Sequence, residues 1–512
     1  MRLTSSALPL LSTVTVASTA AWLLQRNHPR HLATTNKHPS VTSLNMWPFG
    51  SSSSSSNKAT KWSAAEFQTA MQKQTAPVPA SWDDLDRMLR STEPAEERQR
   101  FDDVKRGRGP ANHKANVRLF DAPKGYEPQV TLFRDTAGWC PYCQKVWLQL
   151  EEKRIPYRVE KVPMSCYGDK PASFLKLNPS GGIPVATIKG RTLSESNDIM
   201  TMLEREFPDH IPLLPPSDSP AAARVTPLLR LERRAFSSWF SWLTSSASAP
   251  AAAEMDAVLK QVDAELAAGG GPYFLGPDVS IVDCMFAPFL ERMAASLPYF
   301  KGFEARAARY PHLLRWYEAM DKRDAYRGIK SDYYTHCCDL PPQIGRCASL
   351  PEAAKFKAEI DGGAWSVTVA GRDCLEPMLP VDTREARRDA ARNCINNHAA
   401  VVPFAMRAIG DSGRPVRAPL ANPYATPGDA SYIPAVDFAL RVAVHALLRP
   451  DAADAAPPAL SAGERELLAL LPKDEAAKCL AYLRDRVGCP RDMTVHGARQ
   501  FRAHLNWVID QL

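Results

Sequence analysis

The chain has 512 residues, enough for two to four domains, and its 45% hydrophobic and 23% charged content is ordinary for a globular protein. The formal net charge is +7, but six basic residues precede the first acidic residue, Glu66, and removing those six from +7 leaves +1. Neither nucleic acid nor stable insertion into a membrane is therefore expected of the mature protein. The eleven cysteines do not have the spacing of a disulfide framework, which predicts a reducing compartment.

Residues 1–60 are predicted to be a targeting leader with a Ser-rich linker at 51–56. The leader has Arg2, a mostly apolar stretch at 7–24, and no acidic residue. Pro9 and five hydroxyl residues make that stretch a poor membrane span, so we interpret it as an organelle transit peptide, with the plastid as the favoured destination. Mitochondrial import, secretion, a cytoplasmic location and a weak membrane anchor are the alternatives.

Residues 61–127 are predicted to be an N-terminal extension that is only partly ordered. Two short helical patterns occur at 64–73 and 82–90. A charged segment broken by Gly and Pro follows at 93–110.

The strongest signal is the motif Cys140-Pro-Tyr-Cys143, which follows a predicted strand at 130–134 and a loop through Gly138. Pro141 suits the first position of a helix predicted at 141–153, which places Cys140 at the N-cap. Thiols at helix N-termini in CxxC motifs ionise more readily than free cysteine, so Cys140 is the candidate nucleophile and Cys143 the candidate resolving thiol. Half of a zinc site is the alternative, but no second ligand pair follows at the usual spacing.

The rest of the unit at 128–215 follows the thioredoxin order. Strands are predicted at 157–162, 184–188 and 191–193, with helices near 171–177 and from Glu195. Pro184 at the start of a strand indicates a special turn, and a cis Ile183-Pro184 bond would leave the backbone of Ile183 free to pair with an extended peptide. The Glu195-Ser196 pair at a helix start and Lys170 before the preceding helix could each hold a carboxylate.

These features resemble a cysteine-dependent glutathione transferase over residues 128–335, and from about Trp82 to the C-terminus the chain resembles the iota class of photosynthetic organisms. The similarity is carried by residues 107–110, 119–128, 139–157, 418–426 and 502–507. The resemblance implies an α/β thioredoxin-like domain, then an all-α glutathione-transferase domain, then a mainly helical extra C-terminal domain.

The resemblance also implies glutathione as co-substrate, with no metal. By similarity to the related omega class, Cys140 would exchange the glutathione sulfur and Lys170 would contact the glycyl carboxylate. Ile183 would pair through its backbone, and Glu195 and Ser196 would hold the γ-glutamyl end. Tyr142 and Pro184 complete the predicted glutathione site. Omega enzymes often have Ala where this chain has Cys143, which leaves one-cysteine and two-cysteine turnover both open.

The expected function is a glutathione-dependent thiol transferase. The acceptors that the resemblance implies are glutathionylated proteins, small disulfides, dehydroascorbate or quinones. A non-catalytic binding or scaffold protein is the alternative. Lys145, one turn into the helix, could assist the thiolate, although a solvated face is its more common role. A monomer is favoured over a homodimer, because extra segments on both sides could block the usual dimer surface.

Residues 216–335 are predicted to be helical, with a capping box from Ser280 to Asp283. Three aromatic residues there, Phe236, Trp239 and Phe240, could line an acceptor pocket or simply form core. The cluster of His336, Cys337, Cys338 and Cys347 is a weak metal candidate.

Residues 350–512 form a third, mainly helical unit, with a β-like stretch at 364–370 and a long helical pattern at 384–409. Its cysteines, Cys374, Cys394, Cys479 and Cys489, show no ligand spacing and are interpreted as buried structural thiols. The role of this unit as a cap, dimer surface or docking surface stays open.

Overall fold

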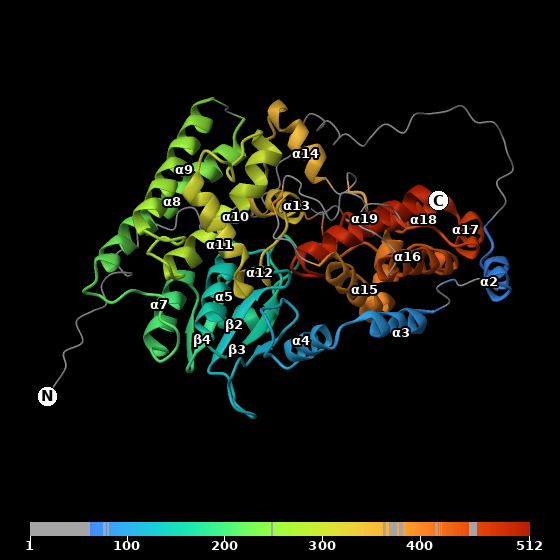
Figure 1. The fold of residues 1–512 in the computed structure, drawn as a ribbon, viewed down its shortest axis with the longest axis horizontal. Helices are drawn as coiled ribbons and strands as arrows, with labels where there is room; N and C mark the ends of the chain where they lie inside the picture. Colours follow the sequence, from blue (N-terminus) through green and yellow to red (C-terminus); the bar gives the residue numbers. More distant parts are fainter. Residues whose placement is uncertain are drawn as a thin grey trace, which may run out of the picture.

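The computed structural model describes residues 62–74, 78, 81–246, 249–361, 365–367, 376–377, 382–414, 418, 420, 422–449 and 458–512. The targeting leader predicted at 1–60 lies outside the described residues, as do Cys374 and most of the β-like stretch predicted at 364–370. Within the described residues the molecule has two large units that lie side by side, one around a sheet and one entirely helical (Figure 1).

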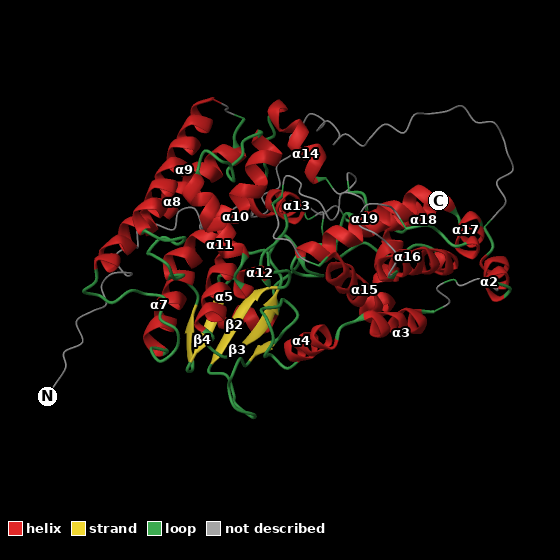
Figure 2. Cartoon of the chain, viewed as in Figure 1, coloured by secondary structure: helices red, strands yellow, loops and turns green. Residues whose placement is uncertain are grey.

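A five-stranded mixed sheet carries the first unit, in the order β1-β3-β2-β4-β5 (Figure 2). The strands are β1 (Val117–Arg118), β2 (Val130–Asp135), β3 (Tyr157–Val162), β4 (Val185–Ile188) and β5 (Arg191–Leu193). β2 and β3 are parallel, and the other neighbours are antiparallel. The four predicted strands are confirmed to within a residue at each end. β1 was not predicted, because two residues are too short to show a periodicity.

Three helices, α5 (Pro141–Lys153), α6 (Ala172–Leu177) and α7 (Ser196–Glu206), surround this sheet. Successive side chains of a strand point to opposite faces. Leu132 of β2 therefore packs into the main core with α5 and α7, whereas Phe133 faces the small cluster formed with Phe174 of α6. The predicted thioredoxin-like arrangement is confirmed.

The helical layer that follows comprises α8 (Pro220–Thr244), α9 (Ala249–Gly269), α10 (Ile281–Lys301), α11 (Pro311–Asp321), α12 (Asp324–Arg327) and α13 (Tyr333–Ile344). All 21 residues of α10 are buried, and this helix packs on α5, α8 and α13. The predicted capping box is present: Ser280 N donates to Asp283 at 2.9 Å, and Trp316 Nε1 donates to the same carboxylate at 2.8 Å. Asp283 thus fixes the start of the central helix.

The C-terminal unit has its own hydrophobic core. After α14 (Ala354–Ile360), it comprises α15 (Thr383–Ala405), α16 (Ile433–Leu448), α17 (Ala462–Ala469), α18 (Lys473–Arg484) and α19 (Val495–Gln511). The helix predicted from 384 to 409 is α15 continued by a 3-10 turn, Met406–Ile409. Residues Ala430–Leu448 are long and apolar enough to cross a membrane, but 67% of that window is buried inside the protein, which is typical of a core helix.

The N-terminal helices belong to this second core. Phe67 of α2 (Ala64–Gln72) and Leu89 of α3 (Trp82–Thr92) are buried with α15 and α16, and Figure 1 shows both helices beside the C-terminal helices. The segment at 93–110 was predicted to be broken by Gly and Pro. Most of it instead forms a helix, α4 (Ala95–Lys105). Glu97 of α4 is buried and pairs with Arg388 at 2.7 Å and Arg392 at 2.6 Å. These long-range ion pairs hold a helix that local propensity alone does not predict.

His504 of α19 makes the C-terminal unit sensitive to acid. Its ring is fully buried, Nδ1 lies 2.7 Å from the carbonyl oxygen of Gln500, and Nε2 has no partner among the described residues. Burial lowers the pKa of His504 from 6.5 to about 4. In the unfolded chain, His504 takes up a proton below about pH 6.5, whereas in the folded chain it stays neutral down to about pH 4. The free energy of unfolding therefore falls as the pH falls through this window.

The expected loss is about 3 kcal/mol between pH 6.5 and pH 4, at about 1.4 kcal/mol per unit of pKa. His504→Leu should therefore show a shallower fall in the free energy of unfolding over this range, measured by urea denaturation at several pH values. Identical pH slopes in wild type and variant would contradict this expectation.

Candidate active site

Cys140 is the N-cap residue of α5, at the end of the loop that leaves β2. Pro141 is the first helical residue, as its missing N–H favours. The side chain of Cys140 is 6% exposed, and its Sγ lies 3.9 Å from the carbonyl oxygen of Ile183. The unpaired N–H groups and partial positive charge at a helix N-terminus suit a sulfur nucleophile at this position.

Cys143 lies one turn further along α5 and is 1% exposed. Burial, reinforced by the neighbouring Cys140, raises the pKa of Cys143 well above its ordinary value. Both residues are free thiols. Cys143 is therefore held in the neutral form in the core.

The sheet topology brings the predicted glutathione residues to one edge. β4 is antiparallel to β2 and β5 is antiparallel to β4, so β5 runs parallel to β2, as β3 does. The carboxyl ends of β2, β3 and β5 and the start of β4 thus share an edge. Cys140 follows β2, Lys170 follows β3, Pro184 precedes β4, and Glu195-Ser196 follow β5. This placement comes from backbone pairing alone.

The loop before β4 has the expected form, because the Ile183-Pro184 bond is cis. Lys170 packs its stem against Gly181 in that loop and donates from Nζ to the carbonyl oxygen of Pro163 at 2.5 Å. Burial lowers the pKa of Lys170, and the sulfurs of Cys143 and Cys140 oppose that shift. Lys170 therefore brings one cation to the end of the sheet that holds the two cysteines.

Glu195 and Ser196 lie at the N-terminus of α7. Glu195 is the N-cap residue and is exposed, whereas Ser196 is the first helical residue and is buried. Burial, and then the neighbouring Asp198, raise the pKa of Glu195. The pair presents one carboxylate and the free N–H groups of a helix start, a combination that can receive an ammonium and a carboxylate.

The aromatic side chains of α8 reach the motif through α10. Phe236 stacks on Phe240 with ring centroids 5.8 Å apart and packs edge-on against Phe289 at 4.9 Å, and Phe289 contacts Tyr142 at 5.8 Å. Trp239 is 2% exposed and donates to Ser296 at 2.9 Å. All three rings are thus connected to the motif, because Trp239 also contacts Phe236 with ring centroids 5.9 Å apart, and both Phe236 and Trp239 are buried in the core.

Lys145 does not lie on a solvated face, and that expectation was wrong. Its side chain is 1% exposed, and Nζ lies 3.4 Å from Glu232 of α8. Burial lowers the pKa of Lys145 to about 8, and Glu232 opposes this shift. The sequence pattern of α5 does not show which of its polar residues face solvent. Lys145 lies on a side of the helix that α8 and α10 cover.

The C-terminal unit touches the motif directly, which the sequence did not indicate. Trp139, immediately before Cys140, donates from Nε1 to the carbonyl oxygen of Cys489 at 2.8 Å, and the guanidinium of Arg491 lies 4.8 Å from its ring centroid. Gly138 has a φ of +81°, and a Cβ there would lie 3.1 Å from Pro490 and 3.2 Å from His113. Segments from both ends of the chain therefore enclose the loop that carries Cys140.

A buried acid lies on the other side of Trp139. Tyr167 packs edge-on against the Trp139 ring, with centroids 5.4 Å apart, and its hydroxyl donates to Asp339 of α13. Gln343 also donates to Asp339. Burial raises the pKa of Asp339 to about 7, against the lowering effect of the Tyr167 hydrogen bond. No local motif marks Asp339, and only the fold brings it to this site.

The weak metal candidate is not assembled in the described residues. His336 is buried and binds Glu291 at 2.7 Å, and Cys337 lies 3.4 Å from the carbonyl oxygen of Ala295. No group of three possible metal ligands occurs in the described part of the chain.

Comparison with known proteins identifies both halves of the first unit. Residues 139–206 match the family model "Glutathione S-transferase, N-terminal domain", and residues 230–319 match "Glutathione S-transferase, C-terminal domain". These matches confirm the predicted fold class, with a further helical C-terminal region beyond them. The N-terminal match begins at Trp139 and includes both cysteines of the motif.

Curated relatives extend this result. The chain is 30% identical to "Probable glutathione S-transferase DHAR1, cytosolic" of Oryza sativa subsp. japonica over 173 residues. This aligned region covers 33% of this chain and 74% of the relative. The chain is 26% identical over 199 residues to "Glutathione S-transferase DHAR2" of Arabidopsis thaliana, covering 38% and 86%. A crystal structure of glutathione transferase Omega 3C from Trametes versicolor is 29% identical, with a TM-score of 0.35 over 40% of this chain and 91% of that one. The chain belongs to the glutathione S-transferase family.

Proposed function

We propose that this protein is a glutathione-dependent thiol transferase whose nucleophile is Cys140. The observation that carries the proposal is the position of its sulfur, at the N-terminus of α5 and 3.9 Å from the carbonyl oxygen of Ile183. A family member with a hydroxyl at this position can stabilise a glutathione thiolate, whereas a cysteine can form a bond to its sulfur. Thiol exchange is therefore the chemistry that this site supports best.

The proposed reaction has two displacement steps. The Cys140 thiolate attacks the glutathionyl sulfur of a mixed disulfide, forms a Cys140–glutathione disulfide and expels the acceptor thiolate, which takes up a proton. A second glutathione thiolate then attacks the glutathionyl sulfur, releases Cys140 and leaves as oxidised glutathione. With dehydroascorbate as acceptor, two glutathione molecules would supply the two electrons and two protons that form ascorbate.

Glutathione is proposed to span the shared edge of the sheet. Lys170 would receive the glycyl carboxylate, the backbone of Ile183 would pair with the cysteinyl residue, and Glu195 and Ser196 would hold the γ-glutamyl end. The position of Lys170 between β3 and α6 and the helix start at α7 support this orientation. The aromatic rings that contact one another beside the motif would then line the acceptor site. They are those of Tyr142, Phe236 and Phe240.

The second glutathione, rather than Cys143, is proposed to release the product in most turnovers. Cys143 is 1% exposed and its pKa is raised well above the ordinary value, so little thiolate is present at neutral pH. The acceptor is proposed to be small, because Cys140 is 6% exposed and the C-terminal unit encloses the Trp139 side of the motif. Residues 350–512 would then act as a cap on the acceptor site.

Intact mass after treatment with oxidised glutathione tests the assignment. Wild type and Cys143→Ser are expected to gain one glutathione, and Cys140→Ser none. Cys166→Ser is the matched control, because Cys166 is a more exposed thiol whose pKa burial raises to about 12, and this variant should be modified like wild type. If Cys140→Ser were modified as readily as wild type, the catalytic assignment would fall and a non-catalytic binding role would replace it.

A further inference from the structure

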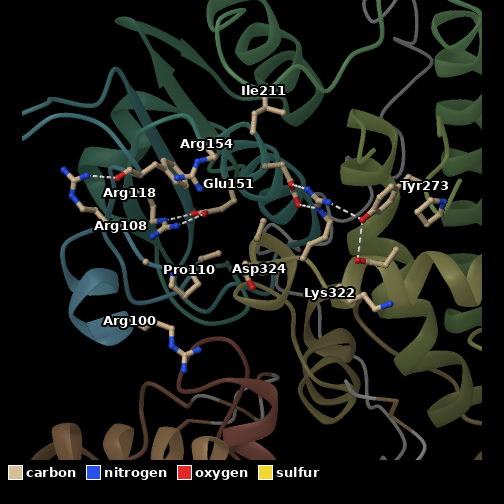
Figure 3. Close-up of a pocket in the computed structure, with 18 of the residues that line it drawn as sticks. Arg100, Arg108, Pro110, Arg118, Glu151, Arg154, Ile211, Tyr273, Lys322 and Asp324 are labelled. Carbon is tan, nitrogen blue, oxygen red and sulfur yellow. Dashed lines mark hydrogen bonds and ion pairs between the residues drawn. The ribbon is translucent and has the colours of Figure 1, made fainter. Parts of the chain in front are cut away.

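A large cavity lies at the end of α5 that is opposite to Cys140. Its volume is about 960 Å³, and it is bounded by α4 and the loop after it, by the last turn of α5, and by α11 and α12 (Figure 3). Arg154, the C-cap residue of α5, is one of its lining residues. Thirteen residues at 1.5 Å per residue separate the two ends of α5 by about 20 Å, so this cavity is distinct from the thiol site.

The lining of this cavity carries an excess of positive charge. Seven basic and four acidic side chains line it, which leaves an excess of three. The basic residues are Arg100, Arg108, Arg118, Arg154, Arg315, Lys322 and Arg323, and the acidic residues are Glu151, Glu152, Glu318 and Asp324. Figure 3 shows Arg108, Arg118 and Arg154 on one side of the cavity and Arg100 below it. Cations thus come from separate elements and surround a common space.

Two of the four acids are already bound in bidentate pairs. Glu151 accepts from Arg118 at 2.8 and 2.9 Å, and Glu152 pairs with Arg323. Three cations remain without a carboxylate partner among the described residues: Arg108 donates only to the carbonyl oxygens of Phe120 and Ala122, and no ion pair there engages Arg315 or Lys322. Their charge is available to a ligand.

One buried donor in the wall also lacks an acceptor. The side chain of Arg118 is 2% exposed; its Nε and Nη2 bind Glu151, and its Nη1 has no hydrogen-bond partner in the described part of the chain. A buried N–H group without an acceptor destabilises the folded state, more so when the group is charged, and such groups are rare in folded proteins. This donor is enclosed by the wall, so an oxygen of a ligand in the cavity reaches it only when the Arg118 side chain shifts.

We propose that this cavity binds a small polyanion, a molecule with at least two phosphate or carboxylate groups. Guanidinium groups bind both kinds of oxyanion through paired N–H donors, and cations contributed by separate elements suit two separate anionic groups rather than one. The volume is at the upper end of ordinary small-molecule sites, which admits a ligand up to nucleotide size. The proposal does not depend on the thiol chemistry at Cys140.

Binding here would join three parts of the chain. Arg100 comes from α4, Arg118 from β1, and Arg323 from the turn before α12, so one ligand would link the N-terminal extension, the thioredoxin-like domain and the helical domain. A ligand that binds only the folded chain raises its stability in proportion to the logarithm of its concentration. The site would thus couple the extension to the catalytic unit.

Isothermal titration calorimetry on the purified whole chain at 150 mM NaCl tests the proposal, with inorganic pyrophosphate and citrate as separate probes. We expect 1:1 binding of at least one probe, weakened at least tenfold in Arg108→Gln and in Arg315→Gln. Binding of pyrophosphate alone would identify a phosphate site, and binding of citrate alone a carboxylate site. Arg87→Gln, which removes a 73% exposed arginine from α3, is the control and should bind like wild type.

Two outcomes would overturn the proposal: no binding of either probe, or an equal loss in Arg87→Gln, which would indicate non-specific attraction. Arg315 is exposed, so its variant keeps the test valid if Arg108→Gln does not fold. Cys140→Ser should bind the probe as wild type does. This last variant separates the polyanion site from the proposed thiol transfer, because either can fail without the other.

Discussion

Cys140→Ser is expected to lower the rate of glutathione-dependent disulfide reduction by at least about 10³-fold, as loss of a covalent nucleophile does in other enzymes. The nearest sulfur cannot replace it. Cys143 is buried in the hydrophobic core with 1% exposure, and burial raises its pKa well above the ordinary value. An acceptor would have to enter the core to reach it.

The measurement is kcat/KM with a small glutathione mixed disulfide and with dehydroascorbate, followed through the oxidised glutathione formed. Cys143→Ser should retain at least about a third of the wild-type rate if a second glutathione resolves the intermediate, a difference of less than 1 kcal/mol in activation free energy. A Cys140→Ser protein that kept a tenth of the activity would refute the mechanism. A Cys143→Ser protein that accumulated the Cys140–glutathione disulfide during turnover with excess reduced glutathione, where wild type does not, would instead assign resolution to Cys143.

The sequence predicts the part of the fold that depends on local pattern. The Cys140-Pro-Tyr-Cys143 motif, the strand before it and the proline at the first helical position determine α5 almost to the residue, because each is a short-range preference. The same holds for the capping box at Ser280. By contrast, β1 and α4 form through pairing with β3 and ion pairs to α15, which sequence periodicity does not record.

The candidate site divides in the same way. Cys140, Lys170, Pro184 and Glu195 can be placed from strand order alone, since each lies in a segment that enters or leaves a strand at one edge of the sheet. The wall made by Cys489 and Arg491 comes from a segment about 350 residues further along the chain, and the contact with Trp139 follows only from how the two cores meet. Burial of a charged residue is likewise a property of packing, as Lys145 shows.

The buried pair between Lys145 and Glu232 joins α5 to α8, and its two partners are not equivalent. Both side chains are 1% exposed, but Glu232 also binds Arg233, whose side chain is 38% exposed. Removing Glu232 leaves the ammonium of Lys145 buried without a carboxylate, whereas removing Lys145 leaves Glu232 paired with Arg233. The cost of losing a partner therefore depends on which one is lost.

Glu232→Gln is expected to lower the free energy of unfolding by about 3–5 kcal/mol, the usual cost of leaving one buried charge unpaired. Lys145→Met should cost only about 1 kcal/mol, because the methionine preserves the buried stem and Arg233 still neutralises the acid. Urea denaturation of wild type and both variants, followed by tryptophan fluorescence, measures the difference. The double variant Lys145→Met/Glu232→Gln should be more stable than Glu232→Gln alone, since it holds no unpaired buried ammonium and Arg233 can turn to solvent. Equal losses of unfolding free energy in the two single variants would contradict the claim that losing Glu232 costs more than losing Lys145. Additive losses in the double variant would show that the two side chains do not interact.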